Sequence, residues 1–269
     1  MEAYTGFARV YDIFMEETPY DKWCKRIVKI LKDNGIKDGL LCELGAGTGE
    51  MTRRLRDKGY DMIGVDNSEE MLAVARAKEE KADPGTKTTG YSGGKSAKAG
   101  NNGEILYLCQ DMREFELYGT VRGIVSVCDS INYITDPSDL TGVFKLVNNY
   151  LDPEGLFIFD FNTKHKYRDV IGDTVIAENR DDESFIWENS YYPEESINEY
   201  DITFFVREGE LFRKFTETHI QRGYTLSEIK KSLAAAGLVF VSAEDSDTGA
   251  APTRASERIL VTARECGKA

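Results

Sequence analysis

The sequence of 269 residues is poor in positive charge and has no long apolar run. It has 34 lysine and arginine residues against 47 aspartate and glutamate residues, which gives a formal net charge of −13. Binding to nucleic-acid phosphates or to anionic lipid needs a basic surface, so both are excluded as main partners. No apolar run reaches the roughly 20 residues that cross a bilayer, and the first residues lack the basic start of a secretory signal. We expect a cytoplasmic protein, monomer or homodimer, that uses neither nucleic acid nor membrane.

The sequence also lacks the spacing of histidine and cysteine residues that is typical of metal sites. The chain has two histidines, His165 and His219, which lie far apart in the sequence. Its five cysteines form no C-x-x-C pair. Protein zinc sites need such side chains at short, regular spacings. We therefore predict that the protein holds no metal.

Strand-like apolar runs alternate with helical patterns along most of the chain. Alternation of this kind predicts βαβ units around a parallel sheet, and right-handed crossovers place helices on both of its faces. The sequence thus indicates a doubly wound α/β fold. The predicted strands are residues 40–44, 61–65, 105–109, 124–128, 156–161, 238–243 and 259–263, and the predicted helices between them are 50–58, 69–78, 140–151 and 225–237.

Three segments depart from this alternation within what we expect to be a single domain, 1–269. Residues 1–35 place apolar side chains at helical spacing and predict an N-terminal helical cap. Residues 83–103 contain almost nothing apolar and predict a flexible loop. Residues 175–224 alternate aromatic with polar side chains around a hairpin turn at 208–210. This pattern predicts an inserted antiparallel β-sheet, which we expect to form a lid over the site.

A glycine-rich turn is the strongest functional signal. The strand at 40–44 runs through Gly45, Gly47 and Gly49 directly into a helix. Glycines let bare backbone approach a ligand where any Cβ would collide, as in sites for nucleotide-like cofactors. Asp66 ends the next strand, where the ribose of such a cofactor would lie. Its carboxylate can accept hydrogen bonds from both ribose hydroxyls.

Two acidic residues bear on the class of cofactor. A dinucleotide fingerprint of the form G-x-G-x-x-G/A, counted from Gly45, needs Gly or Ala where this chain has Glu50. Glu43 precedes the turn, and its carboxylate would repel a pyrophosphate but attract a positive charge. A cationic cofactor is therefore favoured, and a nicotinamide-dependent oxidoreductase is the alternative.

These residues closely resemble the motifs of class I S-adenosylmethionine (SAM) methyltransferases. The first two motifs correspond to ELGAGTG at 43–49 and GVDNS at 64–68. Further along, QDM at 110–112, CDSINY at 128–133 and LDPEG at 151–155 resemble the family's later motifs, with Glu in place of one glycine in the last. The resemblance implies a Rossmann-like, seven-stranded, mostly parallel sheet whose last strand is antiparallel.

The resemblance also implies a function. The enzyme would transfer a methyl group from SAM and release S-adenosyl-L-homocysteine. Its insertion is similar to those of small-molecule N-methyltransferases, which implies a small-molecule acceptor, an amine or other nitrogen nucleophile. A non-catalytic SAM-binding or regulatory protein of the same fold is the alternative from another class.

Positions in the motifs imply the residues that contact the cofactor. The glycine turn would hold the methionine part, the residues after the second and third strands the ribose and adenine, and those after the fourth strand the methionine ammonium. The first helix resembles a segment that covers the cofactor, which brings in Tyr4 and Tyr11. The implied cofactor residues are Tyr11, Glu43, Gly45, Ala46, Gly47, Asp66, Asn67, Gln110, Asp111, Met112, Cys128 and Asp129.

The acceptor side is less defined. Methyl transfer from a sulfonium is an in-line displacement whose leaving thioether needs no proton, so alignment in a closed site can supply much of the rate. A general base is needed only for a protonated acceptor. The predicted catalytic residues are Tyr11, Tyr133, His165 and His219, with Tyr20 and Asn132 as further polar candidates.

Overall fold

A computed structural model describes residues 7–82 and 103–268 and contains a seven-stranded sheet. In spatial order its strands are β10 (Leu238–Asp245), β11 (Arg258–Glu265), β5 (Leu151–Asn162), β4 (Val121–Ser126), β1 (Gly39–Leu44), β2 (Tyr60–Asp66) and β3 (Leu106–Cys109). Strand β11 runs antiparallel to both of its neighbours, and the other neighbouring pairs are parallel. The predicted Rossmann-like sheet is therefore confirmed.

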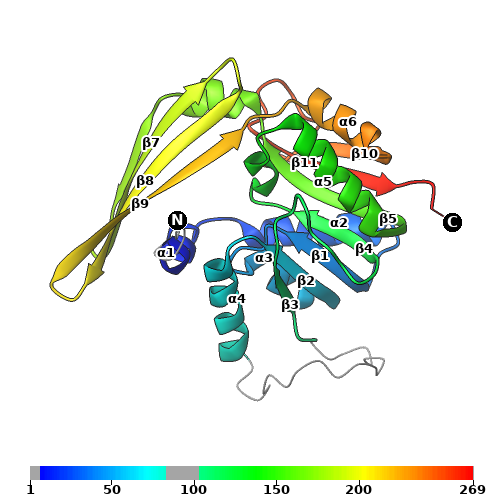
Figure 1. The fold of residues 1–269 in the computed structure, drawn as a ribbon, viewed down its shortest axis with the longest axis horizontal. Helices are drawn as coiled ribbons and strands as arrows, with labels where there is room; N and C mark the ends of the chain where they lie inside the picture. Colours follow the sequence, from blue (N-terminus) through cyan, green and yellow to red (C-terminus); the bar gives the residue numbers. More distant parts are fainter. Residues whose placement is uncertain (1–6, 83–102, 269) are drawn as a thin grey trace.

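Helices cover both faces of this sheet and bury two apolar layers (Figure 1). One face carries α2 (Tyr20–Asp33), α3 (Glu50–Arg56) and α4 (Glu69–Ala82), and the other carries α5 (Pro137–Tyr150) and α6 (Leu226–Ala235). The starts of α5 and α6 follow from local sequence signals: Asp136 caps α5, and Thr225 with Glu228 forms a capping box before α6. None of the helices in the described ranges is long and apolar enough to cross a membrane.

The predicted insertion forms a second, four-stranded antiparallel sheet. Its strands are β6 (Val175–Asn179), β7 (Glu183–Tyr192), β8 (Ile197–Glu208) and β9 (Leu211–Arg222). Figure 1 shows the long hairpin of β8 and β9 reaching away from the main sheet. Two short helices that were not predicted are in contact with the insertion, the 3₁₀-helix η1 (Ser130–Tyr133) with β9 and the π-helix η2 (Lys166–Ile171) with β7.

The first helix, α1 (Phe7–Phe14), packs between the insertion and the main body. Phe7 and Val10 share a small apolar cluster with Phe204 of β8 and Met71 of α4. The helical prediction for the N-terminal segment holds for α1 and α2. The predicted loop at 83–103 falls, apart from its last residue, outside the described residues, as does Tyr4.

Candidate active site

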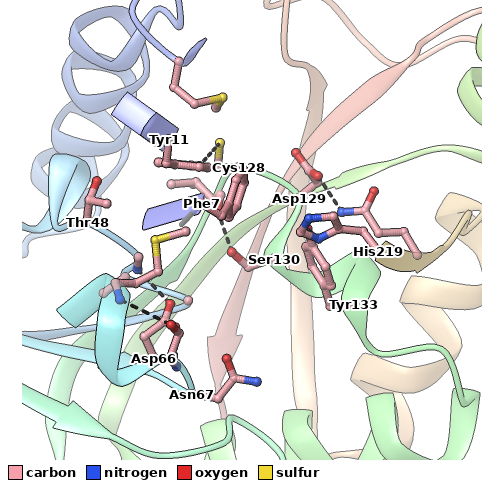
Figure 2. A pocket seen from close by; sticks show the side chains of 18 of the residues that line it. Phe7, Tyr11, Thr48, Asp66, Asn67, Cys128, Asp129, Ser130, Tyr133 and His219 are labelled. Atoms are coloured by element: carbon pink, nitrogen blue, oxygen red, sulfur yellow. Dashed lines mark hydrogen bonds between the residues drawn. The ribbon is translucent and has the colours of Figure 1, made fainter. Parts of the chain in front are cut away.

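A cavity of about 530 Å³ lies at the carboxyl ends of the central strands. The turns after β1, β2, β3 and β4 form one side of the cavity. Helix α1 and side chains of the insertion form the other side. From β1 the chain continues to β2 and β3 on one side of the sheet, and from β4 it continues to β5 on the other side. Open α/β sheets bind ligands at the point between two such neighbouring strands. Figure 2 shows Asp66 and Asn67 on one side of this cavity and Tyr133 and His219 on the other.

The glycine turn presents bare backbone to the cavity. Gly45 and Gly47 have φ angles of 75° and 52°, in the left-handed region that glycine adopts without strain. A Cβ at Gly45 would come within 2.3 Å of the Ser130 hydroxyl oxygen, so the contact with η1 requires glycine there. A Cβ at Gly47 would meet no protein atom within 4 Å, and this residue lines the cavity. The turn is thus shaped to lie against a ligand.

Asp66 joins the glycine turn to the next strand. One carboxylate oxygen accepts the Gly47 amide at 2.8 Å, and the other accepts the Ser68 amide at 2.9 Å. Burial raises the pKa of this carboxyl, which the two amide hydrogen bonds oppose. Each carboxylate oxygen has more than one acceptor site, so a ribose hydroxyl could still be bound.

The residues after β3 form the next part of the same side of the cavity. Asp111 accepts hydrogen bonds from the Arg113 guanidinium at 3.0 Å, and that side chain lowers the pKa of the carboxyl. The Gln110 side chain accepts the amide of Glu116 at 2.9 Å. Met112 lies along the cavity with its terminal methyl near Gly45. Arg113 also lines the site and was not predicted.

Glu43 is a buried acid at the base of the turn, with 2% of its surface exposed. The Thr52 hydroxyl donates a hydrogen bond to it. Burial raises the pKa of Glu43 to about 8, and the nearby charge of Asp66 acts in the same direction. A cation bound in the cavity would favour the ionised form of this carboxyl.

The turn after β4 has a strained backbone. Cys128 and Asp129 adopt φ angles of 63° and 54°, in the left-handed region that non-glycine residues rarely occupy. Both of their amides donate to the carboxylate of Asp160, at 3.2 and 2.8 Å. Asp160 lies on β5 and is 3% exposed. A buried acceptor therefore fixes the conformation of this turn.

A buried arginine completes that arrangement. Arg258, at the start of β11, donates to Asp160 at 3.2 Å and to Asp129 at 2.7 Å. The second oxygen of Asp129 accepts the side-chain amide of Gln221, which belongs to β9 of the insertion. Neither Arg258 nor Gln221 was predicted, because no local pattern links them to the turn after β4.

Three aromatic and imidazole side chains meet on the side of the cavity away from Asp66. The Tyr133 hydroxyl lies 2.9 Å from His219 Nδ1 and 3.3 Å from the Tyr200 hydroxyl. The rings of Tyr200 and His219 stack with centroids 5.0 Å apart. Burial lowers the pKa of His219 to about 4, which keeps the imidazole neutral at pH 7. The Tyr11 hydroxyl lies 3.9 Å from Cys128 Sγ (Figure 2).

The first helix is attached to the glycine-turn side of the cavity through Asp12. One oxygen of this carboxylate accepts the Thr48 hydroxyl at 2.6 Å, and the other pairs with Lys78 of α4 at 2.5 Å. Lys78 also donates to the backbone carbonyl of Thr48. Helix α1 is thereby tied to the glycine turn.

Most of the predicted residues gather at this cavity, but two polar candidates do not. His165 does not line it and instead pairs with Asp169 at 2.8 Å. Asn132 is fully buried and donates to the carbonyls of Asn162 and Arg222. The predicted residues that line the cavity are Tyr11, Tyr20, Glu43, Gly45, Ala46, Gly47, Asp66, Asn67, Gln110, Asp111, Met112, Cys128, Asp129, Tyr133 and His219.

These features fit SAM. The bare backbone at Gly47, the carboxylate of Asp66 and the buried acid Glu43 offer, in turn, room for the methionine part, acceptors for ribose hydroxyls and a counter-charge for a cation. A pyrophosphate would instead disfavour the ionised form of that acid and find no positive counter-charge in it. The chemistry of the donor set therefore agrees with the cationic cofactor expected from the sequence.

Comparison with known proteins gives the same result. A family model described as a methyltransferase domain matches residues 41–94. The chain is 35% identical, over 97% of both chains, to YqeM of Bacillus subtilis (strain 168), which is named as a methyltransferase. An S-adenosylmethionine-dependent methyltransferase from Clostridium acetobutylicum ATCC 824 is 29% identical, with a TM-score of 0.83 over 98% of this chain and 99% of that one.

A more distant structure, the sugar N-methyltransferase KedS8 from Streptoalloteichus sp ATCC 53650, shares the fold at 15% identity. Its TM-score is 0.70 over 93% of this chain and 91% of that one. The nicotinamide alternative finds no support among these proteins, and the cofactor is SAM. The chain belongs to the class I SAM-dependent methyltransferases.

Proposed function

We propose that this enzyme methylates a nitrogen atom of a small molecule held between the glycine turn and the inserted sheet. The observation that carries this proposal is the cavity that joins the cofactor turn to an aromatic wall on the insertion. Its volume falls in the range that proteins use for small ligands. The inserted strands would then act as the lid, and α1 as the cap. The fold neighbour KedS8, a sugar N-methyltransferase, supports a nitrogen acceptor.

The cofactor would lie along the turns at the ends of β1 to β4. We assign the methionine part to the turn from Gly45 to Gly47, and the ribose to Asp66 and Asn67. Gln110, Asp111 and Met112 would contact the adenine, and the strained turn at Cys128 and Asp129 the methionine ammonium. Asp66 would add hydrogen bonds through the acceptor sites that its two amide partners leave open.

When bound, SAM supplies an electrophilic methyl group on a sulfonium. The residues of this chain then align the acceptor nitrogen, whose lone pair forms the new N–C bond as the S–C bond breaks, and they exclude water. Tyr11, Tyr133 and His219 stand where they could position that nitrogen. The neutral imidazole of His219 can accept a hydrogen bond without bringing a charge into the cavity.

Transfer of a tritiated methyl group from SAM to a panel of amines, with matched alcohols and thiols, tests this function. We expect label in amines, and the variant Asp66→Ala should lose most of the transfer. Replacement of each histidine by alanine separates the two predicted histidines: loss of activity is expected for His219, and activity close to that of the parent enzyme for His165. Label only in oxygen acceptors or in protein would refute the proposal.

A further inference from the structure

Two hydrogen-bond donors that line the cavity have no role in the arrangement above. Lys166 begins η2, shortly after the end of β5, and Trp187 lies on β7 of the insertion. Both line the cavity, and η2 is in contact with β7. The site therefore presents a cation and a neutral N–H donor from two different elements.

Lys166 is a cation without a carboxylate of its own. Its ammonium donates to the amide oxygen of Asn162 at 3.2 Å, and no ion pair links it to an acid within the described ranges. Of the acids whose charges act on Lys166, Asp129 and Asp160 are both bound by Arg258, and Glu257 forms no ion pair with this lysine. Burial and the charge of Arg258 lower the pKa of Lys166. The neighbouring acids therefore do not fully balance the positive charge of this lysine.

Trp187 offers the second donor. Its indole Nε1 is buried and has no hydrogen-bond partner in the part of the chain that the structure describes. The indole ring packs against Tyr200, with centroids 5.2 Å apart, so its position is fixed. Buried donors are nearly always paired in native proteins, and an indole N–H can only donate. A ligand oxygen in the cavity would supply the missing acceptor.

Two acids that line the cavity, Asp129 and Glu178, already have partners of their own. Asp129 is held by Arg258 and Gln221, and Glu178 by Arg180. The group that matches an ammonium together with an indole N–H is an oxyanion, since charged hydrogen bonds of this kind are short and strong.

We propose that the methyl acceptor carries an oxyanion, a carboxylate or a phosphate, which Lys166 and Trp187 bind while its nitrogen faces the cofactor. This inference rests on the proposed function, because it adds a recognition group to a small nitrogen acceptor. The acceptor is then an amino acid or another amine with an acidic group. Lys166 and Trp187 act in this reaction as specificity residues.

The charge of the product tests this directly. The enzyme is incubated with tritiated SAM and the low-molecular-weight extract of Bacillus subtilis cells, and the labelled product is separated by electrophoresis at pH 2 and at pH 7. An oxyanion makes the net charge of the product more negative by about one between these values, whereas an aliphatic amine without one keeps its charge. Migration toward the anode at pH 9 separates an oxyanion from a weakly basic nitrogen, which becomes neutral but not negative. Phosphatase treatment, which removes the change only for a phosphate ester, distinguishes the two sources.

Variants then assign the recognition to the two residues. With the labelled acceptor purified, Lys166→Met should raise its KM about ten- to a hundredfold, the loss of one hydrogen bond to a charged group. Trp187→Phe, which keeps an aromatic ring, should raise the KM less. Both should bind SAM within about twofold of the parent enzyme. Lys164→Met is the matched control, because Lys164 pairs with Glu228 at 3.0 Å and does not line the cavity.

Four results would overturn the inference. The labelled product could keep the same charge at pH 2 and pH 7, or Lys166→Met could leave the acceptor KM at the value of the control. Weaker SAM binding by Lys166→Met would instead place this lysine on the methionine carboxylate. Absence of any labelled small molecule, from the extract and from the amine panel alike, would reject the proposed function itself, and the inference with it.

Discussion

The buried carboxyl of Glu43 should make the stability of this fold depend on pH. In the folded chain its pKa is about 8, raised by burial and by Asp66, whereas an unfolded glutamate titrates near 4.3. Between these values the folded state holds a proton that the unfolded state has lost. The contribution of this carboxyl is therefore fully present below about pH 4 and is lost as the pH rises through about 8.

The interval between the two pKa values sets the size of the effect. At about 1.4 kcal/mol for each pH unit, it gives an upper limit of about 5 kcal/mol above pH 8. Glu43→Gln imitates the protonated acid and keeps an oxygen that can accept from Thr52. We expect this variant to exceed the parent's free energy of unfolding by only about 1 kcal/mol at pH 5 and by about 2–5 kcal/mol at pH 9.

Urea unfolding of both proteins at pH 5, 7 and 9 measures this difference, in which the other titrating groups cancel. Calorimetric titration with SAM should show the opposite pH dependence, because a bound cation favours the ionised carboxyl. The SAM affinity of the parent enzyme, relative to that of the variant, should therefore rise from pH 6 to pH 9. If the two proteins show the same pH dependence of unfolding, the carboxyl is ionised in the folded state and the reasoning fails.

Three other changes test the remaining contacts. Asp66→Ala should weaken SAM binding about ten- to a hundredfold by calorimetry, because it removes charge-assisted hydrogen bonds, and unchanged binding would remove Asp66 from the ribose site. Arg258→Met should lower the free energy of unfolding by about 3–5 kcal/mol, since it removes the positive charge beside the buried Asp160 and the partly buried Asp129. Adding Asp160→Asn should then cost less than it does in the parent protein, and strict additivity would contradict the pairing. Asp12→Ala should speed SAM dissociation in stopped-flow measurements, because α1 loses its contacts with Thr48 and α4, and an unchanged rate would show that α1 does not cover the cofactor.

The parts of the fold that were predictable depend on local spacing. The capping box of Thr225 and Glu228, the glycine turn and the alternation of strands and helices each involve residues a few positions apart, and the structure contains all of them. The hairpin at 208–210 belongs to the same class, since Gly209 adopts a φ of 67° in the turn between β8 and β9. These features result from backbone and side-chain preferences that a short segment already expresses.

The parts that were missed depend on contacts between distant segments. Arg258 reaches Asp129 across 129 positions, and Gln221 reaches it across 92. His165 was expected at the site because it follows β5, but the chain turns there into a π-helix and the imidazole pairs with Asp169. A π-helix shifts side chains relative to an α-helix and has no clear sequence signature.

The same distant contacts hold the turn after β4 in its conformation. The left-handed turn at Cys128 and Asp129 is unfavourable for these residue types, and Asp160 holds it through two amides. Asp160 is itself buried, which raises its pKa, and the neighbouring Arg258 of β11 acts in the opposite direction. Strand β11 is near the end of the chain, and Gln221 comes from the insertion. The shape of the turn after β4 therefore depends on contacts with both later segments.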